Sequence, residues 1–319
     1  RFFDMDTHVF EGEEWAALER RLRAMSYFNF AMEYGGLEAQ DVRLFNNCLH
    51  GTEGPSVINF SAMEGLELGL PGWHILGEGR TFDPWEYPMA MFPDGNASVA
   101  RLMVRQLIPA VSPGATFDNI ALADFDYDQL DQAAHPVQLR LNATVVRVRN
   151  TDGGVALTYV RDGKALGVTA RHAVLACYHS IIPHLCPDLP EAQREAQRYQ
   201  VKMPLLLTNV LLRDSSAWDA SGASDIWCPG RMHARIMRWE GNTAGGYEQG
   251  RWGREGAPLN LAFWGSVEEP PGEMTLKERL RAQRARMLSL TLEDYEREVR
   301  ITLDGALGPY GLDVKHDVL

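Results

Sequence analysis

The sequence predicts an α+β fold in which a mixed β-sheet is flanked by helices. Residues 137–170 predict three short strands joined by tight turns, and they lead into the apolar segment Ala173–Cys177. Apolar segments of strand character also occupy residues 204–212, 231–239 and 259–264. The first and last thirds of the chain carry apolar residues at helical spacing instead. Runs of strands and runs of helices in separate stretches are typical of the α+β class.

The three-stranded segment is the most informative part of the chain. Its second strand alternates Val155, Leu157 and Tyr159 on one face, and turn residues stand at 152–154 and 161–164. The segment Ala173–Cys177 has no polar face and no helical period. We therefore expect it to be a strand covered on both sides, as in a parallel sheet.

Two motifs in this stretch resemble the flavin-dependent amine oxidases. The pattern L-N-x-x-V-x-x-V is present as Leu141–Val148, and after the hairpin the pattern A-x-x-x-V-[IL]-A is present as Ala170–Ala176. In that superfamily these motifs carry the chain back into an FAD-binding domain of the amine oxidase and glutathione-reductase-like type.

Further blocks resemble the spermidine dehydrogenase-like branch of the superfamily, and with them the resemblance runs from about residue 25 to about residue 318. They are residues 61–62, 69–72, 92–101, 177–187, 204–213 and 228–230. The resemblance implies three parts: a helical part of the substrate-binding domain at 1–92, an FAD-domain-related segment at 93–188, and a mixed-sheet and helical substrate-binding domain at 189–319.

The resemblance implies FAD as cofactor and indicates which residues would contact it. The main chain of Val145 would meet the adenine. The turn Asp94-Gly95-Asn96 would lie close to the flavin, as the matching G-G turn does in the amine oxidases. A helix that begins beside glycine also leaves free N–H groups that can face a flavin or phosphate, and an ordinary capped helix start is the alternative. Cys177 and Tyr178, at the end of the flavin-side strand, are the remaining cofactor candidates.

No G-x-G-x-x-G pattern stands in the 319 residues, and the chain begins at Arg1 without a methionine. A flavoprotein of this type places the pyrophosphate of its cofactor on such a loop. We therefore expect a dinucleotide-binding fold before Arg1 and a segment that closes over the flavin after Leu319.

Composition supports a globular enzyme with room for two domains: 45% of residues are hydrophobic and 23% are charged. The formal net charge of −12 argues against nucleic acid as a partner. It suits a cationic small-molecule amine, although acidic balance also serves solubility alone. No run of 18 apolar residues is present, so we expect no membrane span.

No metal site is indicated. The four cysteines lack C-x-x-C spacing, and the nine histidines contain no H-E-x-x-H pattern. His50 follows an apolar helix and is a candidate to line the active site, with a hydrogen-bonded loop histidine as the alternative.

Helices are expected at residues 13–25, 26–32, 41–49, 56–68, 97–108, 189–199 and 275–307, with Ser26 as a helix cap. The helix at 97–108 should bury one apolar side, formed by Val99, Leu102, Met103, Leu107 and Ile108.

Substrate contacts are expected from the helical part. A cationic polyamine needs carboxylates remote from the reacting carbon and aromatic faces near it. Glu64 and Trp73 are the candidates, together with Trp85 and Tyr87 in the aperiodic loop 72–93. Alternatives are a solvated or capping role for the carboxylate and simple packing for the aromatic residues.

The catalytic residues are not identified by sequence. In much of the superfamily a lysine holds a water near flavin N5, but the corresponding register here is Thr208-Asn209, and the nearest lysine is Lys202. Lys202 could substitute, or it could be a surface lysine at a strand edge.

The sequence therefore predicts an FAD-dependent oxidoreductase that oxidises an amine C–N bond, in the manner of spermidine dehydrogenase. The alternatives are a non-catalytic binding or structural remnant of the fold and a carotenoid-desaturase-like flavin oxidoreductase. The resemblance also implies haem as a possible further cofactor, because some family members bind it. Members of this branch often carry a twin-arginine signal, which implies a periplasmic location, and a cytoplasmic location is the alternative.

Overall fold

The computed structural model describes residues 10, 12–49, 56–76, 92–238 and 257–319. By internal contacts the chain divides into two compact units. The first unit comprises residues 1–91, 202–242 and 248–319, and the second comprises residues 92–201 and 243–247. Each is described by itself.

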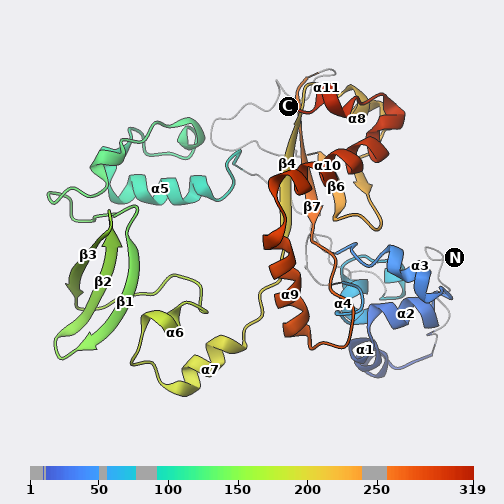
Figure 1. Ribbon diagram of the computed structural model, residues 1–319, viewed down its shortest axis with the longest axis horizontal. Helices are drawn as coiled ribbons and strands as arrows, with labels where there is room; N and C mark the ends of the chain where they lie inside the picture. Colours follow the sequence, from blue (N-terminus) through green and yellow to red (C-terminus); the bar gives the residue numbers. More distant parts are fainter. Residues whose placement is uncertain (1–9, 11, 50–55, 77–91, 239–256) are drawn as a thin grey trace. The chain divides into compact units, whose positions relative to one another are not determined.

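The first unit begins with a cluster of short helices (Figure 1). They are α1 (Trp15–Ala24), α2 (Tyr27–Glu33), α3 (Ala39–Leu44) and α4 (Ala62–Glu67), followed by a 3-10 turn at Trp73–Leu76. The Ser26 hydroxyl accepts from the Asn29 N–H at 3.2 Å and starts α2, which confirms the expected cap. The core between these helices includes Leu22, Tyr27, Phe30 and Leu66.

A four-stranded antiparallel sheet forms the rest of this unit together with the carboxy-terminal helices. Its strand order is β4-β7-β6-β5. The strands are β4 (Leu206–Leu212), β5 (Asp225–Trp227), β6 (His233–Arg238) and β7 (Leu259–Gly265). The strand pairs β4–β7, β7–β6 and β6–β5 are all antiparallel, whereas the sequence predicts a mixed sheet. The short strand β5 is not predicted by the sequence.

One face of this sheet packs against helices. The helices of this part are α8 (Ser216–Ser221), α9 (Leu276–Ser289), α10 (Leu292–Leu307) and α11 (Val314–Asp317). Leu261 and Phe263 of β7, with Ile236 of β6, share a buried core with Leu303 and Leu307 of α10. Capping boxes at Thr275 and Thr291 start α9 and α10, which confirms the helices expected over 275–307.

The second unit contains a three-stranded antiparallel sheet, β1 (Thr144–Thr151), β2 (Gly154–Arg161) and β3 (Lys164–Ala170), in the order β1-β2-β3. It also contains α5 (Ala97–Leu107), α6 (Ile182–Leu185) and α7 (Glu191–Tyr199). The three expected strands, with tight turns at 152–153 and 162–163, are thereby confirmed.

Three expectations about burial are wrong. The segment Ala173–Cys177 forms no strand, and Val174 is 90% exposed, because no described strand pairs with it. Strand β4 is buried on one face only: Leu207 and Leu211 are exposed, whereas Val210 and Leu212 are buried, because helices cover one face of its sheet.

Helix α5 buries a different side from the one expected. Val99, Met103 and Leu107 are exposed, and Leu102 is only half-buried. The buried residues of α5 instead are Ser98 and Arg105, and the Arg105 guanidinium donates to the Pro113 carbonyl at 3.1 Å and to Asn119 Oδ1 at 3.0 Å. These bonds to the loop after α5 orient the helix, so the polar side faces inward. Ile108, just after the helix, is buried as expected.

Candidate functional site

The first unit contains a small apolar pocket with a volume of about 290 Å³. Four stretches of chain meet in it: the start of α2, the end of α3 with the residues after it, the turn after α4, and the hairpin between β5 and β6. Its lining residues are Tyr27, Leu44, Phe45, Asn47, Cys48, Gly69, Leu70, Pro71, Trp227, Pro229 and Ala234. We call this the apolar pocket.

Local backbone geometry brings these stretches together. Gly69 (φ +81°) allows the turn after α4, and Gly230 (φ +71°) allows the turn between β5 and β6. The Cys228 N–H donates to the Ala234 carbonyl at 2.7 Å and closes that hairpin. A Cβ on Gly65 would lie 2.5 Å from the Tyr27 ring, so only glycine lets Tyr27 pack this closely on α4.

The walls of the apolar pocket are electrically neutral. The Tyr27 hydroxyl donates to the Pro71 carbonyl at 2.9 Å, and burial raises the pKa of this phenol. Burial also raises the pKa of the Cys48 thiol to about 12, so it stays protonated at neutral pH. None of the described lining residues carries a formal charge. The rings of Tyr27, Phe45 and Trp227 make the pocket suitable for a hydrocarbon chain or an aromatic-bound ammonium group.

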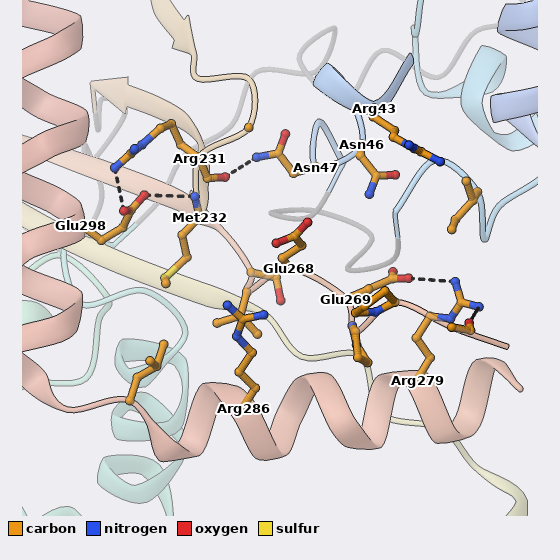
Figure 2. Close-up of a pocket in the computed structure, with 18 of the residues that line it drawn as sticks. Arg43, Asn46, Asn47, Arg231, Met232, Glu268, Glu269, Arg279, Arg286 and Glu298 are labelled. Carbon is orange, nitrogen blue, oxygen red and sulfur yellow. Dashed lines mark hydrogen bonds and ion pairs between the residues drawn. The ribbon is translucent and has the colours of Figure 1, made fainter. Parts of the chain in front are cut away.

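A second, polar pocket of about 840 Å³ lies in the same unit, between α3, the loop after β7 and α9 (Figure 2). Its lining contains four arginines and three glutamates: Arg43, Arg231, Arg279, Arg286, Glu268, Glu269 and Glu298. We call this the polar pocket.

Two ion pairs brace the polar pocket. Arg231 lies 2.6 Å from Glu298, which also accepts from the Met232 N–H at 3.1 Å. Arg279 lies 3.6 Å from Glu269. These pairs neutralise two of the three carboxylates.

Asn47 lines both pockets and is buried. Its side-chain amide donates to the carbonyl of Arg231, so the residue ties the end of α3 to the β5–β6 hairpin. This bond fixes the wall that the two pockets share.

His233 is the first residue of β6, and its side chain meets Thr208 of β4, one of the two residues at the expected lysine register. Its Nε2 is 2.9 Å from Thr208 Oγ1, and its ring stands edge-on to Phe263 at 5.3 Å. Burial, followed by the charge of Arg231, lowers the pKa of this histidine to about 4. A neutral imidazole therefore stands in the core next to Thr208, whereas no lysine does. Sequence reasoning missed this residue because a single histidine inside an apolar strand carries no spacing signal.

The sequence-predicted substrate residues do not line either pocket. The Glu64 carboxylate accepts from the N–H and O–H of Ser61 at 2.7 and 2.8 Å, so it forms a capping box at the start of α4. Trp73 is 45% exposed, with its ring edge-on to His74. Lys202 is exposed and precedes β4. His50 and the aromatic residues Trp85 and Tyr87 lie outside the described residues.

The expected cofactor residues all belong to the second unit. In the turn before α5, Asp94 accepts from the Ser98 hydroxyl at 2.5 Å, Gly95 has φ +63°, and Asn96 makes no side-chain cap on the helix. An added Cβ on Gly95 would meet no atom of the described residues within 4 Å.

The remaining cofactor candidates are also accessible. Val145 pairs with Tyr159, and the β1–β2 register skips Val146, which leaves a bulge directly beside Val145. Cys177 is an exposed free thiol, and Tyr178 is 71% exposed.

Among the described residues, no group of three or more His, Cys, Asp or Glu side chains is placed to hold a metal ion. In the same part of the chain, no helix has both the length and the apolar character needed to cross a membrane.

The chain resembles known proteins in its structure. No family model matches the chain, and no curated protein matches its sequence. A redesigned double mutant of putrescine oxidase matches 97% of this chain at 16% identity and a TM-score of 0.52. Wild-type putrescine oxidase bound to putrescine matches 95% at 17% identity and a TM-score of 0.52. Cyclohexylamine oxidase from Brevibacterium oxydans has a TM-score of 0.46.

The chain spans about half the length of these proteins, 55% of the first and 54% of the second. At this identity the likeness concerns the fold. The chain therefore has a mixed α+β structure with antiparallel sheets that resembles part of the flavin amine oxidase fold.

Proposed function

We propose that this chain provides the amine-binding part of an FAD-dependent oxidoreductase. The reaction is oxidation of an amine C–N bond to an imine, which water hydrolyses to an aldehyde and an amine. The observation that carries the proposal is the apolar pocket. It is lined by two of the sequence blocks that resemble the spermidine dehydrogenase-like branch, at 69–71 and at 229, in a fold similar to part of putrescine oxidase.

The apolar pocket would hold the hydrocarbon part of the amine and exclude water from it. Its neutral walls favour the uncharged amine, which is the form that reacts, because a low-polarity surrounding disfavours the ammonium ion. The faces of Phe45 and Trp227 would attract an ammonium group as it enters. Flavin, when bound, supplies the acceptor for the hydrogen and electron pair that leave the α-carbon.

The second unit has features that fit FAD. Helix α5 has eleven residues and no side-chain cap, so its N-terminal N–H groups can face an anionic or carbonyl group of the cofactor at the turn Asp94-Gly95-Asn96. The bulge beside Val145 frees main-chain groups from the β1–β2 ladder, as recognition of the adenine requires. Cys177 and Tyr178 are proposed for the same cofactor site on the sequence resemblance, and both residues are exposed.

The finer proposal is a polyamine, of the spermidine class, as substrate. Two observations support it: the sequence blocks already named, and the net charge of −12, which attracts a polycation. A periplasmic location is proposed on the same resemblance.

The test is reduction of flavin by amines in the full-length gene product that carries this chain. Spermidine, putrescine and benzylamine are compared at low and high salt, and flavin absorbance is followed without oxygen. We expect polyamines to reduce the flavin fastest and their advantage to shrink with salt, because screening acts over about 8 Å at physiological ionic strength. Faster reduction by benzylamine at both salt concentrations would contradict the polyamine class. A product without flavin would contradict the enzyme itself.

A further inference from the structure

The polar pocket contains charged side chains that the fold leaves unpaired. Arg43 of α3, Arg286 of α9 and Glu268 in the loop after β7 line it. Their side chains have no hydrogen-bond or ion-pair partner within the described ranges, in contrast to the braced pairs Arg231–Glu298 and Arg279–Glu269.

These unpaired groups come from different walls of the cavity. Figure 2 shows Arg43 and Asn46 on the helical wall, Arg286 rising from α9, and Glu268 on the loop between them. The braced glutamates hold this arrangement. Glu269 is buried and accepts from the Ser56 N–H at 2.9 Å, which fixes the loop that carries Glu268.

Two buried polar atoms in the lining also lack a partner, Asn46 Oδ1 and Arg279 Nε. A buried polar atom without a hydrogen bond costs free energy, and a ligand or water that pairs with it removes this cost. The pocket is therefore polar, incompletely satisfied and open to small molecules.

The charge balance of the lining selects the ligand. Four arginines against three glutamates give a local excess of one positive charge in a chain of net charge −12. After the two braced pairs, two guanidinium groups and one carboxylate remain. The complementary molecule carries two anionic groups and one cationic group.

We infer that the polar pocket binds a dicarboxylic amino acid of the glutamate class. Its two carboxylates pair with Arg43 and Arg286, because a guanidinium binds a carboxylate through two parallel N–H···O bonds. Its ammonium group pairs with Glu268. The volume of about 840 Å³ is within the range of small-molecule sites and leaves room for bridging water.

Other ligand classes fit less well. A polyamine would bring several positive charges next to four guanidinium groups, and inorganic phosphate would leave Glu268 unpaired beside an anion. The inference goes beyond the proposed amine oxidation and does not depend on it, since binding is measured without flavin and without turnover.

The first experiment is calorimetric titration of the purified chain with L-glutamate, glutarate, putrescine and inorganic phosphate. We expect L-glutamate to bind most tightly, glutarate more weakly because it lacks the ammonium group, and putrescine and phosphate not measurably. Absence of L-glutamate binding at millimolar concentration, or equal binding of putrescine, would overturn the inference.

The second experiment compares arginine variants on the two helices. R43Q and R286Q should each weaken L-glutamate binding about tenfold or more, the usual effect of losing a charge-assisted bond. The matched control is R284Q, which changes an exposed arginine of α9 that does not line the pocket and should leave binding unchanged. Equal affinity in R43Q, R286Q and R284Q would overturn the site.

The variant E268Q tests the contact with the ammonium group of the ligand separately from the contacts with its carboxylates. It should weaken binding of L-glutamate, which loses its ammonium partner, and should leave glutarate binding equal or stronger, because a negative charge has gone. Parallel weakening of both ligands would contradict the assigned role of Glu268. Thermal melts of all variants, each expected to match the wild type, show that the changes act on binding, because all four substituted residues are exposed.

Discussion

Two neighbouring glutamates of the first unit occupy opposite environments. Glu269 is buried, accepts two hydrogen bonds from Asn59 at 2.9 and 2.6 Å and one from Ser56, and lies near Arg279. Glu268 is exposed and has none of these contacts. Burial of a paired carboxylate makes its removal costly, because its partners are left unsatisfied.

Glu269→Ala should lower the free energy of unfolding by about 2–4 kcal/mol, whereas Glu268→Ala should change it by about 0.5 kcal/mol or less. Urea denaturation of the purified chain measures both. Equal stability of the two variants would show that Glu269 does not hold the loop to the helical part.

His233 should make stability depend on pH. In the unfolded chain this histidine takes up a proton near pH 6.5, but in the folded protein only near pH 4. The unfolded state therefore binds more protons between these values, so the free energy of unfolding falls as pH drops from 6.5 to 4. The loss from this group reaches roughly 3 kcal/mol, at about 1.4 kcal/mol for each unit of pKa difference.

The measurement is urea denaturation between pH 7 and pH 4 for the wild type and for His233→Gln, which cannot titrate. The variant should show a shallower loss of stability over this window. Identical pH profiles would mean that His233 is accessible to protons in the folded state.

At the scale of elements, sequence reasoning succeeded where local chemistry decides the structure. The Ser26 cap and the turns at 152–153 and 162–163 act through residues a few positions apart, so sequence identifies them. Sequence reasoning failed where residues distant in the sequence decide whether a segment is buried. The apolar residues of 173–177 need strands on both sides, and Val174 is exposed because no described strand supplies them. The apolar side of α5 is exposed because Arg105 bonds to the following loop.

Two glycines of the first unit differ in what an added side chain would meet. A Cβ on Gly265 in β7 would lie 2.0 Å from the Met232 carbonyl oxygen, at the irregular start of the β6–β7 pairing. A Cβ on Gly305 in α10 would meet nothing within 4 Å.

Gly265→Ala should therefore destabilise the protein by about 1–3 kcal/mol or more, because the strands must separate. Gly305→Ala should stabilise it by about 0.5–1 kcal/mol, because alanine is the better helix former. Thermal unfolding of both variants tests this. Destabilisation by Gly305→Ala, or an unchanged midpoint for Gly265→Ala, would contradict the packing described here.

At the scale of the whole molecule, the candidate site was only partly predictable. The sequence indicated the blocks at 69–72 and 228–230, and the structure brings residues of both into one apolar pocket. It could not indicate Tyr27, Phe45 and Trp227 as partners in that pocket, because they are far apart in sequence and have no common motif. The predicted substrate residue Trp73 is nearly as exposed as Trp227, but it does not line the apolar pocket.

The central claim is that the apolar pocket holds the amine, and Trp227 and Trp73 provide a matched pair to test it. They are 47% and 45% exposed, and only Trp227 lines the pocket. The measurement is the rate of flavin reduction against putrescine concentration in the full-length gene product. Trp227→Ala should raise the apparent Kd for the amine about tenfold, the usual value of a lost aromatic contact, and Trp73→Ala should leave it unchanged. A raised Kd in Trp73→Ala with an unchanged Kd in Trp227→Ala would contradict the account and place the amine outside this pocket.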